Sequence, residues 1–126
     1  MIRASGVLMI SPAGRVLLLQ RSAEGDWAGA WGCPGGKIED GEDAATAAVR
    51  ETLEETGRRI GSAGAELCTR IADDVHFTTF MTKVDEEFTP VLNSEHIGFM
   101  WVLPEEALRD YMPPPMATVA GPASVN

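Results

Sequence analysis

The chain carries Gly35-Gly36-Lys37-Ile38-Glu39-Asp40-Gly41-Glu42, and after seven residues it continues with Arg50-Glu51-Thr52-Leu53-Glu54-Glu55-Thr56-Gly57. Alanine, valine and leucine dominate residues 43–56, and Gly57 stands where a C-terminal helix cap belongs. We therefore expect a helix from about Asp43 to Thr56. At about 100° per residue, Glu51, Glu54 and Glu55 lie together on the side opposite the alanine-rich face.

Three neighbouring glutamates are unfavourable on a helix by themselves. Like charges at this spacing cost about 0.2–0.5 kcal/mol per pair, and negative charge in the last turn opposes the helix dipole by about 0.3–1 kcal/mol. A bound divalent cation would offset these costs, and carboxylate oxygens are the hard ligands that Mg²⁺ or Mn²⁺ prefers. The glutamates alone leave open a simpler interpretation, a solvated acidic face on an amphipathic helix.

The glycine-rich loop before the helix favours the metal-site interpretation. Pro34-Gly35-Gly36 lets the backbone turn sharply and approach a metal or a phosphate closely. Lys37 is a mobile positive charge that could meet a phosphate oxygen. A P-loop is excluded, because no Gly-Lys-Ser/Thr triplet follows at the required spacing, and the dinucleotide-binding fingerprint is absent as well.

The rest of the chain predicts several strands and one further helix. Apolar runs and alternation indicate strands at 7–10, 16–19, 67–72, 75–84 and 97–103. The second run is apolar throughout and should be buried on both faces, and the turn before it suggests a hairpin with the first. Pro104 fits the first turn of a short helix over 105–111. The irregular alternation of strands and helices predicts an α/β fold with a mixed sheet covered by helices.

Composition limits the classes of function. The chain has 126 residues and a net charge of −9, which predicts one domain over 1–112, followed by a Pro-rich tail over 113–126. The acidity argues against nucleic-acid polymers and anionic membranes as partners. No apolar run approaches the ~20 residues needed to span a bilayer, and no secretory signal begins the chain. We expect a cytoplasmic protein, with Cys33 and Cys68 as small apolar residues rather than a disulfide framework.

The two quoted stretches together resemble the Nudix box, G-x5-E-x7-R-E-U-x-E-E-x-G-U, in which U is aliphatic. The box covers residues 36–58, and every fixed position is matched at the right spacing by Gly36, Glu42, Arg50, Glu51, Glu54, Glu55 and Gly57. Thr52 and Arg58 depart from the two aliphatic positions. Weaker likeness extends through 17–21, 31–35 and 95–104.

This resemblance implies an α/β/α sandwich around a central mixed β-sheet, and an enzyme that hydrolyses nucleoside diphosphates linked to another group with Mg²⁺ or Mn²⁺. By motif position the metal ligands would be the backbone carbonyl of Gly35 together with Glu51, Glu54 and Glu55.

The resemblance also implies roles for residues around the metal. Arg50 would orient a box glutamate through a salt bridge, and Glu42 would support the loop. Glu95, on a later loop, is the candidate that completes the site. Either Glu54 or Glu95 would take the proton from the attacking water. Arg21 would bind substrate phosphate, the role considered above for Lys37.

The substrate is predicted from marks that the chain lacks. Relatives that cut ADP-ribose often carry a proline about fifteen residues after the box, and residues 71–75 contain none. The longer motif of NADH-cutting relatives is also missing. These absences favour a nucleoside or deoxynucleoside triphosphate, released as monophosphate and pyrophosphate. Two alternatives remain, a catalytically idle nucleotide sensor and an acidic interaction module without a ligand, and a homodimer is left open.

Overall fold

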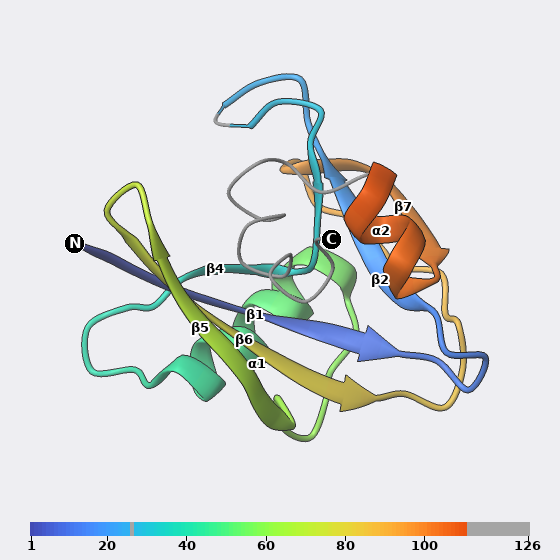
Figure 1. The fold of residues 1–126 in the computed structure, drawn as a ribbon, viewed down its shortest axis with the longest axis horizontal. Coiled ribbons are helices and arrows are strands. Elements are labelled where there is room, and N and C mark those ends of the chain that lie inside the picture. Colours follow the sequence, from blue (N-terminus) through green and yellow to red (C-terminus); the bar gives the residue numbers. More distant parts are fainter. Residues whose placement is uncertain (26, 111–126) are drawn as a thin grey trace.

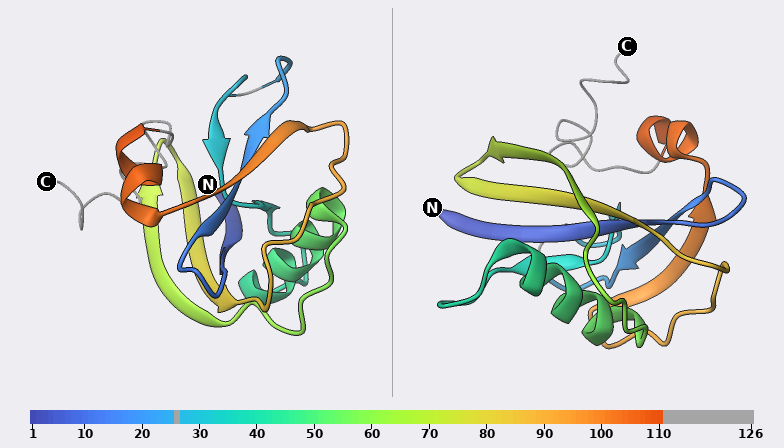
Figure 2. Two further views of the ribbon diagram at one scale, coloured as in Figure 1. Left: turned by 90° about the vertical axis from the view of Figure 1, so that its right-hand side faces the viewer. Right: turned by 90° about the horizontal axis from the view of Figure 1, so that it is seen from below.

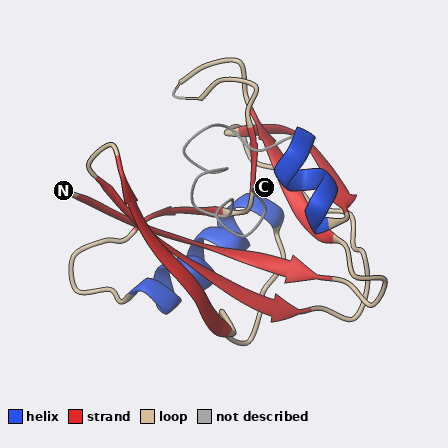
Figure 3. Cartoon of the chain, in the orientation of Figure 1, coloured by secondary structure: helices blue, strands red, loops and turns tan. Residues whose placement is uncertain are grey.

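The computed structural model describes residues 1–25 and 27–110, so the predicted tail over 113–126 and the predicted end of the last helix at Tyr111 lie outside the described residues. Within that part, seven strands form one sheet with two helices packed against it (Figures 1 and 3). The elements are β1 (Ile2–Ile10), β2 (Val16–Arg21), β3 (Trp31–Gly32), β4 (Gly35–Lys37), α1 (Ala44–Thr56), β5 (Ala65–Ala72), β6 (Val75–Lys83), β7 (His96–Val102) and α2 (Pro104–Asp110).

The sheet is mixed, as the sequence predicted. Its main order is β3-β2-β1-β6-β5, with β4 pairing β1 and β7 pairing β2. β1 and β6 run parallel along their whole length, from Ile2 opposite Val75 to Ile10 opposite Lys83, whereas the other pairs are antiparallel. The predicted hairpin between β1 and β2 is reduced to one pair at the turn, Ile10 opposite Val16, because β6 and β4 are the main partners of β1.

Alternation along the two central strands builds the α/β/α sandwich. Val7, Met9, Leu17 and Leu19 share one core cluster with Ala48 of α1. The alternate residues Leu8, Ile10, Val16 and Leu18 share a second cluster with Ala107 of α2. Successive strand side chains point to opposite faces, so the two helices cover opposite faces of the sheet (Figure 2). Val16 to Leu19 are buried throughout, as predicted for a strand covered on both sides.

Helix α1 has well-defined ends. Asp43 is its N-cap, with Oδ1 accepting from the Thr46 N–H at 2.7 Å. Gly57 ends the helix in the left-handed conformation, φ 77°, and its N–H donates to the Leu53 carbonyl at 2.9 Å. Thr52, the first departure from the box, is fully buried, and its hydroxyl donates to the Ala48 carbonyl at 2.8 Å. The polar group is thereby satisfied inside the core.

Arg58, the second departure from the box, fills the aliphatic position in another way. Its guanidinium lies 4.6 Å from the centre of the Phe88 ring and pairs with Asp85 and Glu86, each at 3.2 Å. Both acidic side chains remain mostly exposed. The arginine therefore ties the end of the box to the linker between β6 and β7. No helix in the described part of the chain is both long and apolar enough to cross a membrane.

Candidate active site

A cavity of about 630 Å³ opens beside the acidic end of α1. Its lining combines carboxylates from Glu51, Glu55 and Glu95, cationic side chains from Arg21, Lys37 and Arg70, and aromatic rings from Trp27, Trp31 and Phe77. Phe77 contributes because β6 alternates, with Phe80 of the same strand pointing into the core. Anionic, cationic and aromatic groups are thus gathered around one space that is large enough for a small ligand.

Glu55 is the most constrained of the acidic residues. Only 2% of it is exposed, and its carboxylate accepts one hydrogen bond from the Gly35 N–H at 3.0 Å. Burial raises the pKa of Glu55 to about 9, the Gly35 hydrogen bond opposes this shift, and the negative charges of Glu51 and Glu95 add to it. The acidic face of the helix is therefore covered by the glycine loop at this residue instead of being solvated.

The two glycines of the loop are required by close approach. A Cβ on Gly36 would lie 2.5 Å from the carboxylate carbon of Glu51. A Cβ on Gly35 would collide with the carbonyl oxygen of Ser5 in β1, because β4 pairs closely with that strand. The absence of side chains lets the loop lie between β1 and the acidic end of α1.

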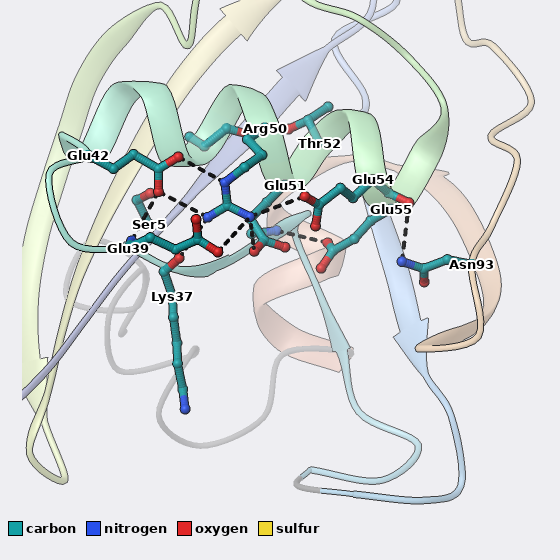
Figure 4. Close-up of polar contacts among 12 residues, drawn as sticks. Ser5, Lys37, Glu39, Glu42, Arg50, Glu51, Thr52, Glu54, Glu55 and Asn93 are labelled. Atoms are coloured by element: carbon teal, nitrogen blue, oxygen red, sulfur yellow. Dashed lines mark hydrogen bonds and ion pairs between the residues drawn. The ribbon is translucent and has the colours of Figure 1, made fainter.

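Arg50 binds several carboxylates together beside the cavity (Figure 4). Its Nε and Nη2 donate to both oxygens of Glu42, at 2.8 and 3.0 Å, and Nη1 donates to Glu51 at 3.0 Å and to Glu54 at 3.2 Å. Nη2 also donates to the Lys37 carbonyl at 3.0 Å. The fork lowers the pKa of Glu42 to about 2. Arg50 therefore contacts Glu51 and joins the loop to the helix, and its predicted role of orienting a metal ligand stays a prediction.

The structure brings some predicted site residues together and separates others. Glu51, Glu55, Glu95, Arg21 and Lys37 line the cavity with Gly35, whereas neither Glu54 nor Arg50 is among the described residues that do. The Glu54 side chain is 52% exposed and held by Arg50. The Lys37 side chain extends away from the carboxylates (Figure 4).

Sequence reasoning did not assign to the site two residues that lie beside Glu95. His96 is buried beside Glu95, and its Nδ1 atom has no hydrogen-bond partner in the described part of the chain. Burial and the nearby Arg21 lower the pKa of His96. Asn93 contacts both α1 and the loop that carries Glu95. Neither side chain belongs to the box, so only their proximity in sequence to Glu95 could have indicated them.

The carboxylate oxygens beside the cavity are suitable ligands for a divalent cation, although they are not arranged around a common point. Across residues 1–25 and 27–110, no three His, Cys, Asp or Glu side chains form a ready-made metal centre, and Arg50 holds Glu51 and Glu54. The buried Glu55 carboxylate has carboxylate neighbours and a single backbone donor. Such a group is stabilised by a cation, and oxygen donors suit Mg²⁺ or Mn²⁺.

A mixed sheet between two helices, with a carboxylate-lined cavity formed by a glycine loop and a helix end, defines an α/β protein with a small-ligand site. A model of the NUDIX domain matches residues 2–120. The chain therefore belongs to the Nudix family of hydrolases, which generally use divalent metal cations and act on nucleotide substrates.

Individual relatives agree with this assignment. The CTP pyrophosphohydrolase of Escherichia coli K12 is 35% identical, over 80% of this chain and 76% of the relative. The solution structure of the E. coli ORF135 protein is 28% identical, covers 100% of this chain and 95% of its own, and superposes with a TM-score of 0.74. The MutT protein of Methanosarcina mazei Go1 is 27% identical, with coverages of 90% and 85% and a TM-score of 0.75.

Proposed function

We propose that this protein is a Mg²⁺-dependent nucleotide pyrophosphohydrolase that converts a nucleoside or deoxynucleoside triphosphate to the monophosphate and pyrophosphate. The observation that carries the proposal is the buried Glu55 carboxylate, which faces the cavity beside Glu51 and the glycine loop. The similarity to a CTP pyrophosphohydrolase supports a single nucleotide as the substrate. Mn²⁺ is expected to substitute for Mg²⁺.

In this proposal, the Glu51, Glu54 and Glu55 carboxylates would hold the metal together with the Gly35 carbonyl. The metal would supply charge neutralisation at the phosphates and activation of the attacking water. Arg50 keeps Glu51 oriented through the fork to Glu42. Arg21 and Lys37 add positive charge at the cavity for the phosphate oxygens.

The same cavity offers a place for the nucleoside. Trp27, Trp31 and Phe77 line it, and aromatic rings of this kind stack on bases. A volume of about 630 Å³ is large enough for one nucleotide.

Glu95 is assigned as the residue that accepts the proton of the attacking water, because it lines the cavity whereas Glu54 is bound to Arg50. Glu95 is also exposed to solvent. Cys33 also lines the cavity, but burial raises the pKa of its thiol to about 12, which argues against a nucleophilic role.

The proposal is tested with a panel of nucleotides incubated with Mg²⁺, in which released phosphate and pyrophosphate are measured separately. We expect pyrophosphate from one or more triphosphates, and a loss of at least about 100-fold in kcat in Glu55→Gln. A variant as active as the wild type would refute the assignment of Glu55.

The idle sensor predicts a different result from the same panel. A nucleotide with Mg²⁺ would raise the Tm of either an enzyme or a sensor, because both bind the ligand in the folded state. Only the enzyme turns it over, and an acidic module without a ligand shows neither effect.

A further inference from the structure

The linker between β6 and β7 is attached to the C-terminal end of α1. The last carbonyls of a helix have no partner inside it, and α1 has no basic residue in its last turn to compensate. The linker supplies donors for two of them. The Val91 N–H donates to the Thr56 carbonyl at 2.8 Å, and the Asn93 side-chain Nδ2 donates to the Glu54 carbonyl at 3.1 Å (Figure 4).

Asn93 also shapes the loop that follows it. Its Oδ1 accepts from the Glu95 N–H at 3.0 Å, which forms a turn closed by the asparagine side chain. Its carbonyl accepts from the His96 N–H at 3.3 Å. One side chain therefore joins the end of the box helix to the backbone of Glu95. On the other side, the Glu95 carbonyl accepts from the Ser22 N–H at 2.9 Å, at the end of β2.

This arrangement places Glu95 relative to the box carboxylates. Glu95 lines the same cavity as Glu51 and Glu55, and its charge acts on Glu55. A loop residue keeps such a position only if its backbone is fixed to the element that carries its partners. We propose that Asn93 is a positioning residue, which holds Glu95 in register with the acidic end of α1 by joining the Glu54 carbonyl to the Glu95 N–H. The inference rests on the proposed role of Glu95 in water activation.

Two substitutions of Asn93 distinguish its hydrogen bond to the Glu54 carbonyl in the helix from its hydrogen bond with the Glu95 N–H in the turn. Asn93→Ala removes both side-chain hydrogen bonds. Asn93→Ser keeps a hydroxyl that can close the turn on the Glu95 N–H but is too short to reach the Glu54 carbonyl. We expect both to lower kcat about ten- to hundredfold, with KM nearly unchanged, because only the placement of the reacting group is lost. Wild-type kcat in Asn93→Ser would show that the hydrogen bond from Asn93 to the Glu54 carbonyl is not needed, and would overturn the proposal.

Arg15→Ala is the matched control, because it weakens the attachment of the linker between β6 and β7 at a different point. It removes the pair between Arg15 and Glu87 at 3.0 Å, at the beginning of the linker. We expect kcat to stay at the wild-type value. An equal loss of kcat in Arg15→Ala would mean that Asn93 acts only through general linker stability, and would overturn the proposal.

A double-mutant cycle with Glu95→Gln shows whether Asn93 acts through Glu95. Residues that act through one another are non-additive, so Asn93→Ala should cost nothing further in the Glu95→Gln background. Full additivity would overturn the proposal. Hydrogen exchange at the Glu95 amide, followed in the same variants, should be faster in Asn93→Ala.

These readouts separate the two proposals. If Glu95→Gln keeps the wild-type kcat, the role of Glu95 is wrong, and the catalytic role of Asn93 is wrong with it, even where amide exchange increases. If Glu95→Gln loses activity and Asn93→Ala does not, the role of Glu95 stands and the positioning role alone is wrong.

Discussion

Gly36 and Glu51 lie so close that a Cβ on the glycine would be 2.5 Å from the carboxylate carbon and 2.6 Å from Oε2 of the glutamate. Gly36→Ala should therefore displace the Glu51 carboxylate, which is the flexible partner, and leave the fold intact. We expect kcat to fall about 10–100-fold, together with weaker Mn²⁺ binding, as for other changes that misplace a metal ligand. Steady-state kinetics and calorimetric titration with Mn²⁺ measure both effects.

Gly61→Ala provides the control for that substitution. A Cβ at Gly61 meets no atom within 4 Å, so the change alters the chain entropy and little else. Wild-type kinetics are expected. Unchanged metal binding in Gly36→Ala would show that the glutamate does not need its present position.

Glu55→Gln should stabilise the metal-free protein while it abolishes activity. The pKa of Glu55 is raised from 4.5 to about 9 by burial, so the metal-free wild type loses stability as the pH rises through that interval, because the carboxyl ionises in the unfolded chain but stays protonated in the folded one. The neutral amide removes the cost, and we expect a gain of about 1–3 kcal/mol in the free energy of unfolding above that interval. Urea unfolding in a chelator, at several pH values, measures this gain.

The pH dependence of the free energy of unfolding distinguishes the burial of Glu55 from a general effect of removing one negative charge. Glu105→Gln also removes one negative charge, but from an exposed residue of α2, and should not reproduce the gain in the free energy of unfolding. Equal slopes against pH in Glu55→Gln and the wild type would show that burial does not disfavour the ionised form of Glu55 in the folded protein.

Local sequence patterns predicted most of the elements. The helix expected from about Asp43 to Thr56 is found at Ala44–Thr56, and Gly57 caps its C-terminal end as expected. The parallel pairing of β1 with β6 could not be predicted, because it depends on residues about seventy positions apart. The beginning of β1 was missed for a similar reason. Ser5 and Gly6 carry no apolar signal and are extended because β4 and β6 pair with them.

The candidate site also has a part that local sequence patterns predicted and a part that depends on tertiary packing. The box spacing predicted that Glu51 and Glu55 act together, and both line the cavity. The pattern also placed Glu54 with them, but exposure and the contact with Arg50 separate it in the structure. Helical periodicity cannot show which acidic residue a loop covers, and the burial of Glu55 depends on the packing of Gly35 against β1.

Arg50→Lys should impair the site although it keeps the positive charge. A lysine cannot reproduce the two parallel hydrogen bonds to Glu42 while also reaching Glu51 and the Lys37 carbonyl. We expect kcat to fall about 10–100-fold, because Glu51 loses its orientation. Retention of wild-type kcat would show that the fork geometry is unimportant. Acid titration gives a second readout, because the pKa of Glu42, now about 2, should move up toward its ordinary value in the variant.

Arg58→Leu restores the aliphatic residue that the Nudix box expects, and it should nevertheless destabilise this chain. The leucine keeps apolar contact with Phe88 but loses the guanidinium that lies 4.6 Å from its ring, a contact worth about 0.5–1 kcal/mol at a partly exposed site. The ion pairs with the exposed Asp85 and Glu86 contribute less, because solvent screens them. Urea unfolding at low and at high salt should therefore give nearly the same loss, and kcat should not change. A loss that disappears in high salt would assign the effect to the ion pairs, and a gain in stability would show that the aliphatic residue packs better here than the arginine.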